Sequence, residues 1–168
     1  SKKFKKDLSN TTIDPIQLSK ILVKLKKQNI NNVIMEASSH GLSQNRLDGL
    51  LFNTGIFTNL SQDHLDYHKN TKNYLKAKLY LFEKLIKTKG TIITDEKIPE
   101  FKKIKNIATN KNLNLFTLLD KKNNFQFLSH QYEHESQLLE IKYKNSIHKI
   151  KLNLIGKVQF KNVLMAVI

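Results

Sequence analysis

Short, uninterrupted apolar runs, each followed by a polar loop, constrain the fold of this chain more than any other feature of its sequence. Residues 33–35, 55–58 and 91–94 are such runs, and each has the pattern of a β-strand that is buried on both faces. Apolar residues at helical spacing occupy residues 15–28 and 71–87. Strands that alternate with helices predict an α/β fold with a largely parallel sheet flanked by helices.

The ends of these elements and the last third of the chain complete the predicted order. Asp14 and Pro15 start the first helix, Thr71 caps the second, and Lys89-Gly90 ends it. Weaker strand candidates and a short helix follow, and short alternating stretches then predict a small antiparallel sheet before a final apolar helix. The ranges are 104–108 and 113–118 for the strands, 99–103 for the short helix, 125–128, 138–141 and 147–154 for the antiparallel sheet, and 160–168 for the final helix.

Composition makes one soluble domain in a reducing compartment the expected setting. The 168 residues are 39% hydrophobic and 26% charged, and they include no cysteine. No apolar run approaches the roughly 18 residues that cross a bilayer. We therefore expect a cytoplasmic protein that does not act at a membrane.

The distribution of charge argues against a nucleic-acid partner, although the net charge is +15. Arg46 is the only arginine among the 29 basic residues, and no lysine occurs between Lys27 and Lys69. That window holds one basic and four acidic residues, together with three of the six histidines. This composition is typical of a metal site and not of a surface that follows a phosphate backbone.

Acidic and imidazole side chains follow two of the predicted strands directly. Glu36, His40 and His64 lie on loops at the carboxyl ends of these strands, where ligands bind in open α/β sheets. A carboxylate and an imidazole with bound water can hold a divalent cation, and hard oxygen ligands favour magnesium over zinc. Spacing alone leaves the simpler alternatives of a capping carboxylate and a hydrogen-bonded histidine.

Lys78 lies in the middle of the apolar stripe of the second predicted helix. It is four residues after Tyr74 and four before Phe82, so these side chains share one face. Burial disfavours the charged ammonium, and the neutral amine is the form that reacts or is modified. The alternative is a lysine whose stem packs on the apolar face while its charge reaches water.

Several ordered motifs resemble the central domain of the Mur ligases, most closely the MurE type. Residues 33–49 read VIMEASSHGLSQNRLDG and residues 54–68 read TGIFTNLSQDHLDYH. The match continues with the NTT of residues 10–12, with YLKAKLYLF at residues 74–82, which resembles the modified-lysine helix, and with residues 156–168. The resemblance covers nearly the whole chain.

This resemblance implies a ligase of peptidoglycan precursor synthesis. Such an enzyme adds the third amino acid, diaminopimelate or lysine, to UDP-N-acetylmuramoyl-L-alanyl-D-glutamate, and it consumes ATP. In the family the substrate carboxylate is phosphorylated to an acyl phosphate, which the incoming amine then attacks. The implied cofactors are Mg²⁺, ATP as a substrate, and a carbamate formed on a lysine.

The family's functional residues map onto positions of this sequence. Lys78 matches the catalytic lysine that is carbamylated, and Glu36 and His64 match the residues that bind magnesium together with that carbamate. The positions that bind the muramoyl dipeptide are matched by Asn10, Thr11, Thr12, Ser38, Gln44 and Arg46, and Asn162 matches a position near the nucleotide.

The family's phosphate loop, G-x-x-G-K-[ST], does not occur in the sequence. We therefore expect residues 1–168 to be part of the central domain of a longer, monomeric enzyme and to be inactive alone. Within that part, we expect a parallel α/β region at 1–120, an antiparallel meander at 121–156 and the start of a helix at 157–168.

Three other functions stay open at this point. Folylpolyglutamate synthase belongs to the same superfamily, although the SSH after Glu36 and the pair Gln44 and Arg46 favour the MurE type. A metal-dependent hydrolase would use Glu36, His64 and a water without ATP. A basic nucleic-acid-binding domain would need lysines that converge on one face.

Overall fold

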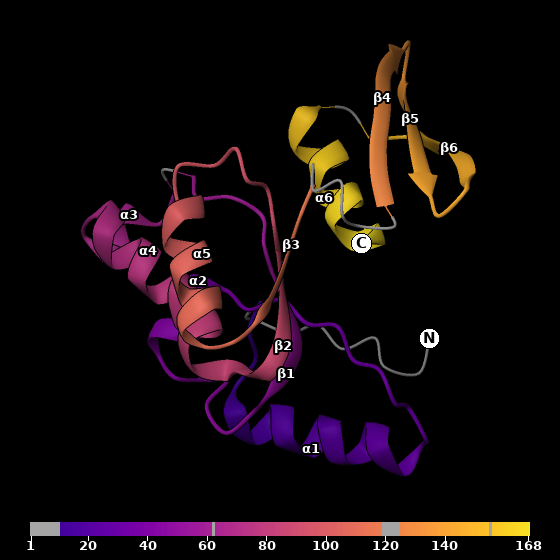
Figure 1. Cartoon of the computed structure of the whole chain (residues 1–168). Coiled ribbons are helices and arrows are strands. Elements are labelled where there is room, and N and C mark those ends of the chain that lie inside the picture. Colours follow the sequence, from indigo (N-terminus) through magenta and orange to yellow (C-terminus); the bar gives the residue numbers. More distant parts are fainter. Residues whose placement is uncertain (1–10, 62, 119–124, 155) are drawn as a thin grey trace. The chain divides into compact units, whose positions relative to one another are not determined.

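The structure is a computed structural model that describes residues 11–61, 63–118, 125–154 and 156–168. It divides the chain into two compact units (Figure 1). The first unit comprises the described parts of Ser1–Leu51 and Gln62–Leu85, and the second comprises those of Phe52–Ser61 and Ile86–Ile168. The predicted division at residues 120 and 156 stays a prediction.

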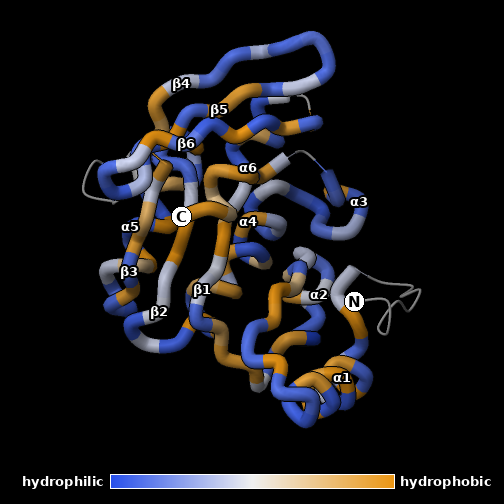
Figure 2. The backbone as a smooth tube through the Cα atoms, turned by 90° about the vertical axis from the view of Figure 1, so that its right-hand side faces the viewer, coloured by the Kyte–Doolittle hydropathy of each residue, from blue (hydrophilic) through white to orange (hydrophobic). Residues whose placement is uncertain are grey.

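The first unit consists of helices. They are α1 (Pro15–Lys27), α2 (Ser39–Ser43), α3 (Leu65–His68), α4 (Thr71–Tyr80) and the π-helical turn η2 (Leu81–Leu85). Side chains cap the N-termini of three of these described helices, α1, α2 and α4. Asp14 accepts hydrogen bonds from the backbone amides of Ile16 and Gln17, as the sequence predicts. Hydrophobic and hydrophilic residues are interspersed along α1 in Figure 2.

The predicted second helix is confirmed, but both of its ends differ from the prediction. Asn70 caps α4 by accepting a 2.8 Å hydrogen bond from the amide of Asn73, so the cap lies one residue before Thr71. The helical segment ends at Leu85, and Lys89-Gly90 lies inside the next strand. A Cβ at Gly90 would come within 2.9 Å of the Asn53 carbonyl oxygen, so glycine permits the close approach of two backbones here.

The predicted strand at residues 33–35 is wrong. These residues have no strand assignment, and the side chain of Ile34 is fully exposed (100%). A strand needs a neighbour that completes its backbone hydrogen bonds. Among the residues that the structure describes, no strand pairs with this segment, so its apolar pattern alone does not make it a strand.

The second unit contains the predicted parallel sheet. Strands β1 (Phe52–Phe57), β2 (Ile86–Thr94) and β3 (Asn114–Thr117) pair in parallel in the order β1-β2-β3. This confirms the strands expected at 55–58, 91–94 and 113–118. The strand candidate at 104–108 is wrong, because it lies in α5 (Phe101–Asn110). Ile104 and Ala108 are four residues apart and buried, so their apolar pattern is that of a helix face.

An antiparallel sheet and a helix complete the second unit. Strands β4 (Phe125–Glu133), β5 (Ser136–Tyr143) and β6 (Ser146–Leu152) form the predicted meander, and α6 (Lys157–Val167) follows. Figure 1 shows α6 in yellow beside this sheet in orange. Leu139 and Ile141 of β5 pack in one core cluster with Leu164 and Met165 of α6. The fold class is therefore as predicted, a parallel sheet with flanking helices and a smaller antiparallel sheet.

Candidate active site

Three histidines and two tyrosines gather in the first unit. The rings of His40 in α2 and His64, which precedes α3, have centroids 5.0 Å apart. His68 at the end of α3 stacks on Tyr74 of α4 at 5.1 Å, and its Nε2 lies 2.9 Å from the Ser39 hydroxyl. The structure therefore brings together two of the histidines that the sequence places at strand ends, and it adds a third that is buried.

Burial lowers the pKa of His68 below its usual value, and the neighbouring His40 and His64 lower it further by repulsion. The backbone of His64 has a φ of +60°, a left-handed conformation in which His is found more often than most residues. This conformation starts the short helix α3, which carries both Tyr67 and His68.

Lys78 lies next to this cluster, one helical turn after Tyr74. Its Nζ is 5.5 Å from the centroid of the Tyr74 ring, and the His64 ring is 6.0 Å from the same ring. Tyr74 is buried, and Lys78 is half-buried. The lysine amine and the imidazole of His64 thus have a buried tyrosine as a common neighbour.

Glu36 and the residues around it take part in a compact set of hydrogen bonds. The Thr12 hydroxyl donates to the carbonyl oxygen of Glu36 at 3.1 Å and accepts from the amide of Ser38 at 2.9 Å. The carboxylate of Glu36 belongs to an exposed residue. A Cβ at Gly41 would lie 2.6 Å from the Thr12 side chain, so only glycine leaves room for Thr12 here.

The side chains of Glu36, His64 and unmodified Lys78 fit a hard cation such as magnesium only in part. Within the described ranges, no group of three or more His, Cys, Asp and Glu side chains could hold a metal ion. The predicted set has two such residues, Glu36 and His64. Its third member, Lys78, supplies oxygen atoms only after carbamylation, and magnesium accepts one or two carboxylates with water and substrate oxygens. A carbamate on Lys78 would add oxygen ligands of the kind that magnesium prefers, and the assignment of these three residues to magnesium stays a prediction.

Three of the predicted substrate-binding residues, Thr12, Ser38 and Arg46, are joined by hydrogen bonds in the first unit. Thr12 is buried, and its carbonyl oxygen accepts a 2.7 Å hydrogen bond from Nη1 of Arg46. The hydroxyls of Thr12 and Ser38 are 2.8 Å apart. Thr11 is exposed next to Thr12, and Asn10 lies outside the described residues. Their assignment to substrate binding stays a prediction.

Asn162 lies on α6, in the second unit. Its neighbour Lys161 forms a 2.5 Å ion pair with Asp95, a buried carboxylate just after β2. Asp95 also accepts a 2.9 Å hydrogen bond from the amide of Lys97. No local spacing predicts this pair, because its members are 66 residues apart.

Tyr67 and His68 are the site residues that the sequence analysis missed. The Tyr67 hydroxyl oxygen accepts hydrogen bonds from Gln44 Nε2 at 3.0 Å and from the Ser43 hydroxyl at 3.1 Å. These hydrogen bonds from Ser43 and Gln44 lower the pKa of Tyr67. A signal was present in the sequence: His64, Tyr67 and His68 are three and four residues apart, the spacing of one helix face.

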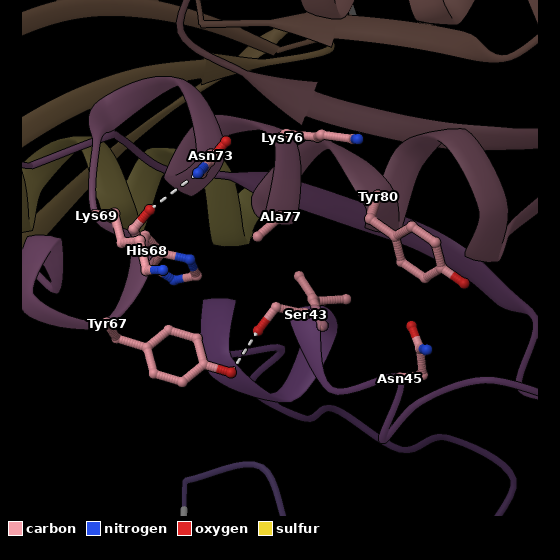
Figure 3. Close-up of a pocket in the computed structure, with 10 residues that line it drawn as sticks. Ser43, Asn45, Tyr67, His68, Lys69, Asn73, Lys76, Ala77 and Tyr80 are labelled. Carbon is pink, nitrogen blue, oxygen red and sulfur yellow. Dashed lines mark hydrogen bonds between the residues drawn. The ribbon is translucent and has the colours of Figure 1, made fainter.

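A cavity of about 470 Å³ lies beside this group, entirely within the first unit. Figure 3 shows Tyr67 and Ser43 on one side of it, and Asn73 and Ala77 of α4 on the other. Tyr80 points toward Asn45 in the same view. Asn45, which lies between Gln44 and Arg46 in the loop after α2, therefore lines this cavity.

Comparison with known proteins identifies the family. The model of the Mur ligase middle domain matches residues 2–168. The chain belongs to the Mur ligase family. The match extends over the motifs from which the resemblance was drawn, including the helix that carries Lys78 and the segment that carries Asn162.

Two relatives of this Mur ligase domain are named UDP-N-acetylmuramoyl-L-alanyl-D-glutamate–2,6-diaminopimelate ligases. The protein of Brucella melitensis is 39% identical over 163 residues, which are 94% of this chain and 32% of the relative. The protein of Zymomonas mobilis is 35% identical over 159 residues, which are 95% of this chain and 33% of the relative. The chain thus spans about a third of the length of the curated relatives it matches, and its predicted resemblance to the MurE type is confirmed.

Solved structures confirm the Mur ligase fold. A ligase of the same name has a TM-score of 0.75 at 24% identity, and the match covers 92% of this chain and 32% of that one. MurF ligase from Thermotoga maritima in complex with ADP has a TM-score of 0.53 at 14% identity and covers 70% of this chain and 26% of that one. A folylpolyglutamate synthetase complex with AMPPCP has a TM-score of 0.58 at 11% identity, with 90% of this chain and 42% of that one covered. At these identities the likeness is one of fold.

The described helices of this Mur ligase domain include none that combines the length and apolar character needed to span a bilayer.

Proposed function

We propose that this Mur ligase domain is the ATP-using part of an enzyme that adds the third amino acid to UDP-N-acetylmuramoyl-L-alanyl-D-glutamate. The names of its relatives support this substrate, and they favour 2,6-diaminopimelate over lysine as the amino acid. Structural neighbours with bound ADP and AMPPCP support the use of ATP. The enzyme acts as a monomer in the cytoplasm, where ATP and the UDP-linked precursor are made.

The observation that carries the proposal is the position of Lys78 against Tyr74, the ring that His64 also approaches. The neutral form of an amine is the one that reacts with CO₂. The nitrogen lone pair can then form a bond to the carbon of CO₂, and the nitrogen loses a proton. The product is a carbamate, whose two oxygens are ligands of the kind that magnesium prefers.

The chemistry of the proposed reaction then follows in two steps. A carboxylate oxygen of the muramoyl dipeptide attacks the γ-phosphorus of ATP, and ADP leaves. The amino group of the incoming amino acid attacks the acyl carbon, phosphate leaves, and the nitrogen loses a proton. Glu36, His64 and the carbamate of Lys78 would hold magnesium, which would supply positive charge for the transferred phosphoryl group.

The roles of the remaining residues are to bind and to orient. The guanidinium of Arg46 can hold a carboxylate or phosphate in a fixed plane, which a lysine cannot do. Its bond to the Thr12 carbonyl joins it to the segment of Thr11 and Thr12, next to Ser38. Asn162 on α6 contacts the nucleotide.

A grafted ligase tests the proposal. The matching third of the Brucella melitensis ligase is replaced by this chain, and formation of the tripeptide product is measured with UDP-N-acetylmuramoyl-L-alanyl-D-glutamate, ATP and diaminopimelate or lysine. We expect product and phosphate in equal amounts, with diaminopimelate preferred. A graft that unfolds cooperatively, and is therefore folded, but forms no product with either amino acid would contradict the proposal.

A further inference from the structure

The hydroxyl of Tyr67 connects α3 to the end of α2. Tyr67 is 40% exposed, yet its ring is held by two neighbours, with the His40 ring at 4.1 Å and the His68 ring at 4.8 Å. Its oxygen accepts a 3.0 Å hydrogen bond from the side-chain amide Nε2 of Gln44. The ring position is thus fixed by packing, and the hydroxyl is directed at the residue that ends α2.

This hydrogen bond determines which end of the Gln44 side chain is available to a ligand. A carboxamide has a donor end, Nε2, and an acceptor end, Oε1. The Tyr67 oxygen accepts a hydrogen bond from the donor end, Nε2. The carbonyl oxygen is then the end that can accept a hydrogen bond from a ligand, and a ligand with an N–H group fits it.

The rest of the loop after Gln44 is held independently of Tyr67. The Tyr80 hydroxyl donates to both carboxylate oxygens of Asp48 at 3.0 Å, and Arg46 donates to the Thr12 carbonyl at 2.7 Å. Removing the Tyr67 hydroxyl therefore leaves the loop anchored and frees mainly the side chain of Gln44.

We propose that Tyr67 is a positioning residue, which orients the carboxamide of Gln44 so that Oε1 accepts a hydrogen bond from an amide N–H of the muramoyl dipeptide. The inference rests on the proposed function, because it takes Gln44 as a contact of that substrate. Tyr67 itself does not touch the substrate. It acts by accepting the hydrogen bond from Nε2 of Gln44, which leaves Oε1 for a donor on the substrate.

The first test observes Gln44 directly, without any substrate. In the ¹⁵N-labelled 168-residue chain, the side-chain amide protons of Gln44 are compared between the wild type and Tyr67→Phe, which keeps the ring and removes the hydroxyl. We expect the Gln44 resonances to shift and their exchange with water to become faster. Tyr143→Phe, the same change at an exposed position on β5, is the control and leaves them unchanged. Identical Gln44 resonances in the wild type and Tyr67→Phe would overturn the proposal.

The second test asks whether Tyr67 acts through Gln44. In the grafted ligase, Tyr67→Phe raises the KM for UDP-N-acetylmuramoyl-L-alanyl-D-glutamate about 3- to 10-fold, the effect of one hydrogen bond, while kcat and the KM for ATP stay unchanged. In a Gln44→Ala background, Tyr67→Phe adds nothing further. An equal increase in both backgrounds would contradict a positioning role. A folded wild-type graft without activity is a failure of the proposed function, whereas the Gln44 resonances decide the positioning role separately.

Discussion

His68 is the most buried of the three clustered histidines, and its environment favours the neutral imidazole. Burial lowers its pKa first, and the nearby His40 and His64 add repulsion to the charged form. The Ser39 hydroxyl and the Tyr74 ring hold the imidazole in place. Protonation of His68 is therefore less favourable in the folded state than in the unfolded state.

This arrangement predicts how stability depends on pH. Because the folded pKa of His68 lies below its unfolded value of 6.5, the unfolded state binds the proton first. The contribution of neutral His68 to the free energy of unfolding is therefore complete above pH 6.5. It is lost as the pH falls from 6.5 toward the folded pKa of His68. Urea unfolding between about pH 8 and pH 5 should show a steeper loss of stability in the wild type than in His68→Gln. The same dependence of the free energy of unfolding on pH in the wild type and in His68→Gln would refute this prediction.

At the level of single residues, the sequence identified most of the group but not its connections. Thr12, Ser38, Gln44 and Arg46 were found by resemblance, and the structure brings Thr12, Ser38 and Arg46 into hydrogen-bonding contact. The partner of Gln44, Tyr67, was missed although it lies in the motif of residues 54–68, because the motif does not show which residue its hydroxyl contacts. A hydrogen bond between side chains 23 residues apart depends on how α2 and α3 pack, and no local pattern encodes that.

At the level of elements, apolar patterns do not show which runs are strands, because a strand also needs a neighbouring strand to pair with. Residues 33–35 and 55–58 have similar apolar runs, yet β1 has β2 as a parallel neighbour and residues 33–35 have no described partner strand. Residues 104–108, a weaker strand candidate, lie in α5, where the buried Ile104 and Ala108 share one helix face. The cap of α1 and the alternating meander were predicted correctly, because their signals are local, whereas the cap and the end of the second helix were not.

The ion pair between Asp95 and Lys161 ties the end of β2 to α6, and its loss should be costly. The Asp95 side chain is 3% exposed and that of Lys161 is 38% exposed. Lys161→Met leaves a buried carboxylate without its cation, which we expect to lower the free energy of unfolding by about 2–3 kcal/mol, less than a fully buried pair because Lys161 is partly in water. Denaturant unfolding measures this change.

The matched control is Lys149→Met, which removes the exposed pair with Glu140 on the antiparallel sheet. Exposed pairs contribute little, so we expect a change of about 0–1 kcal/mol. Adding Asp95→Asn to Lys161→Met should restore part of the lost stability, since the buried charge is then gone. Equal effects of Lys161→Met and Lys149→Met would show that burial of Asp95 does not matter.

For the molecule as a whole, the fold class and the family could be inferred from sequence because both depend on the order of motifs along the chain. The assignment to the Mur ligase family is confirmed, and so is the mixture of parallel and antiparallel sheets. The catalytic roles depend instead on chemistry that the sequence does not contain, above all a carbamate on Lys78. In the proposed function, that modification would connect the half-buried lysine, the predicted magnesium ligands and the use of ATP.

The most direct measurement of this central claim is ¹³C NMR of the chain in ¹³C-labelled bicarbonate with Mg²⁺. We expect one carbamate signal in the wild type, its loss in Lys78→Ala, and its persistence in Lys76→Ala, which removes an exposed lysine from the same helix. The absence of a carbamate signal in the wild type, or its survival in Lys78→Ala, would contradict the account.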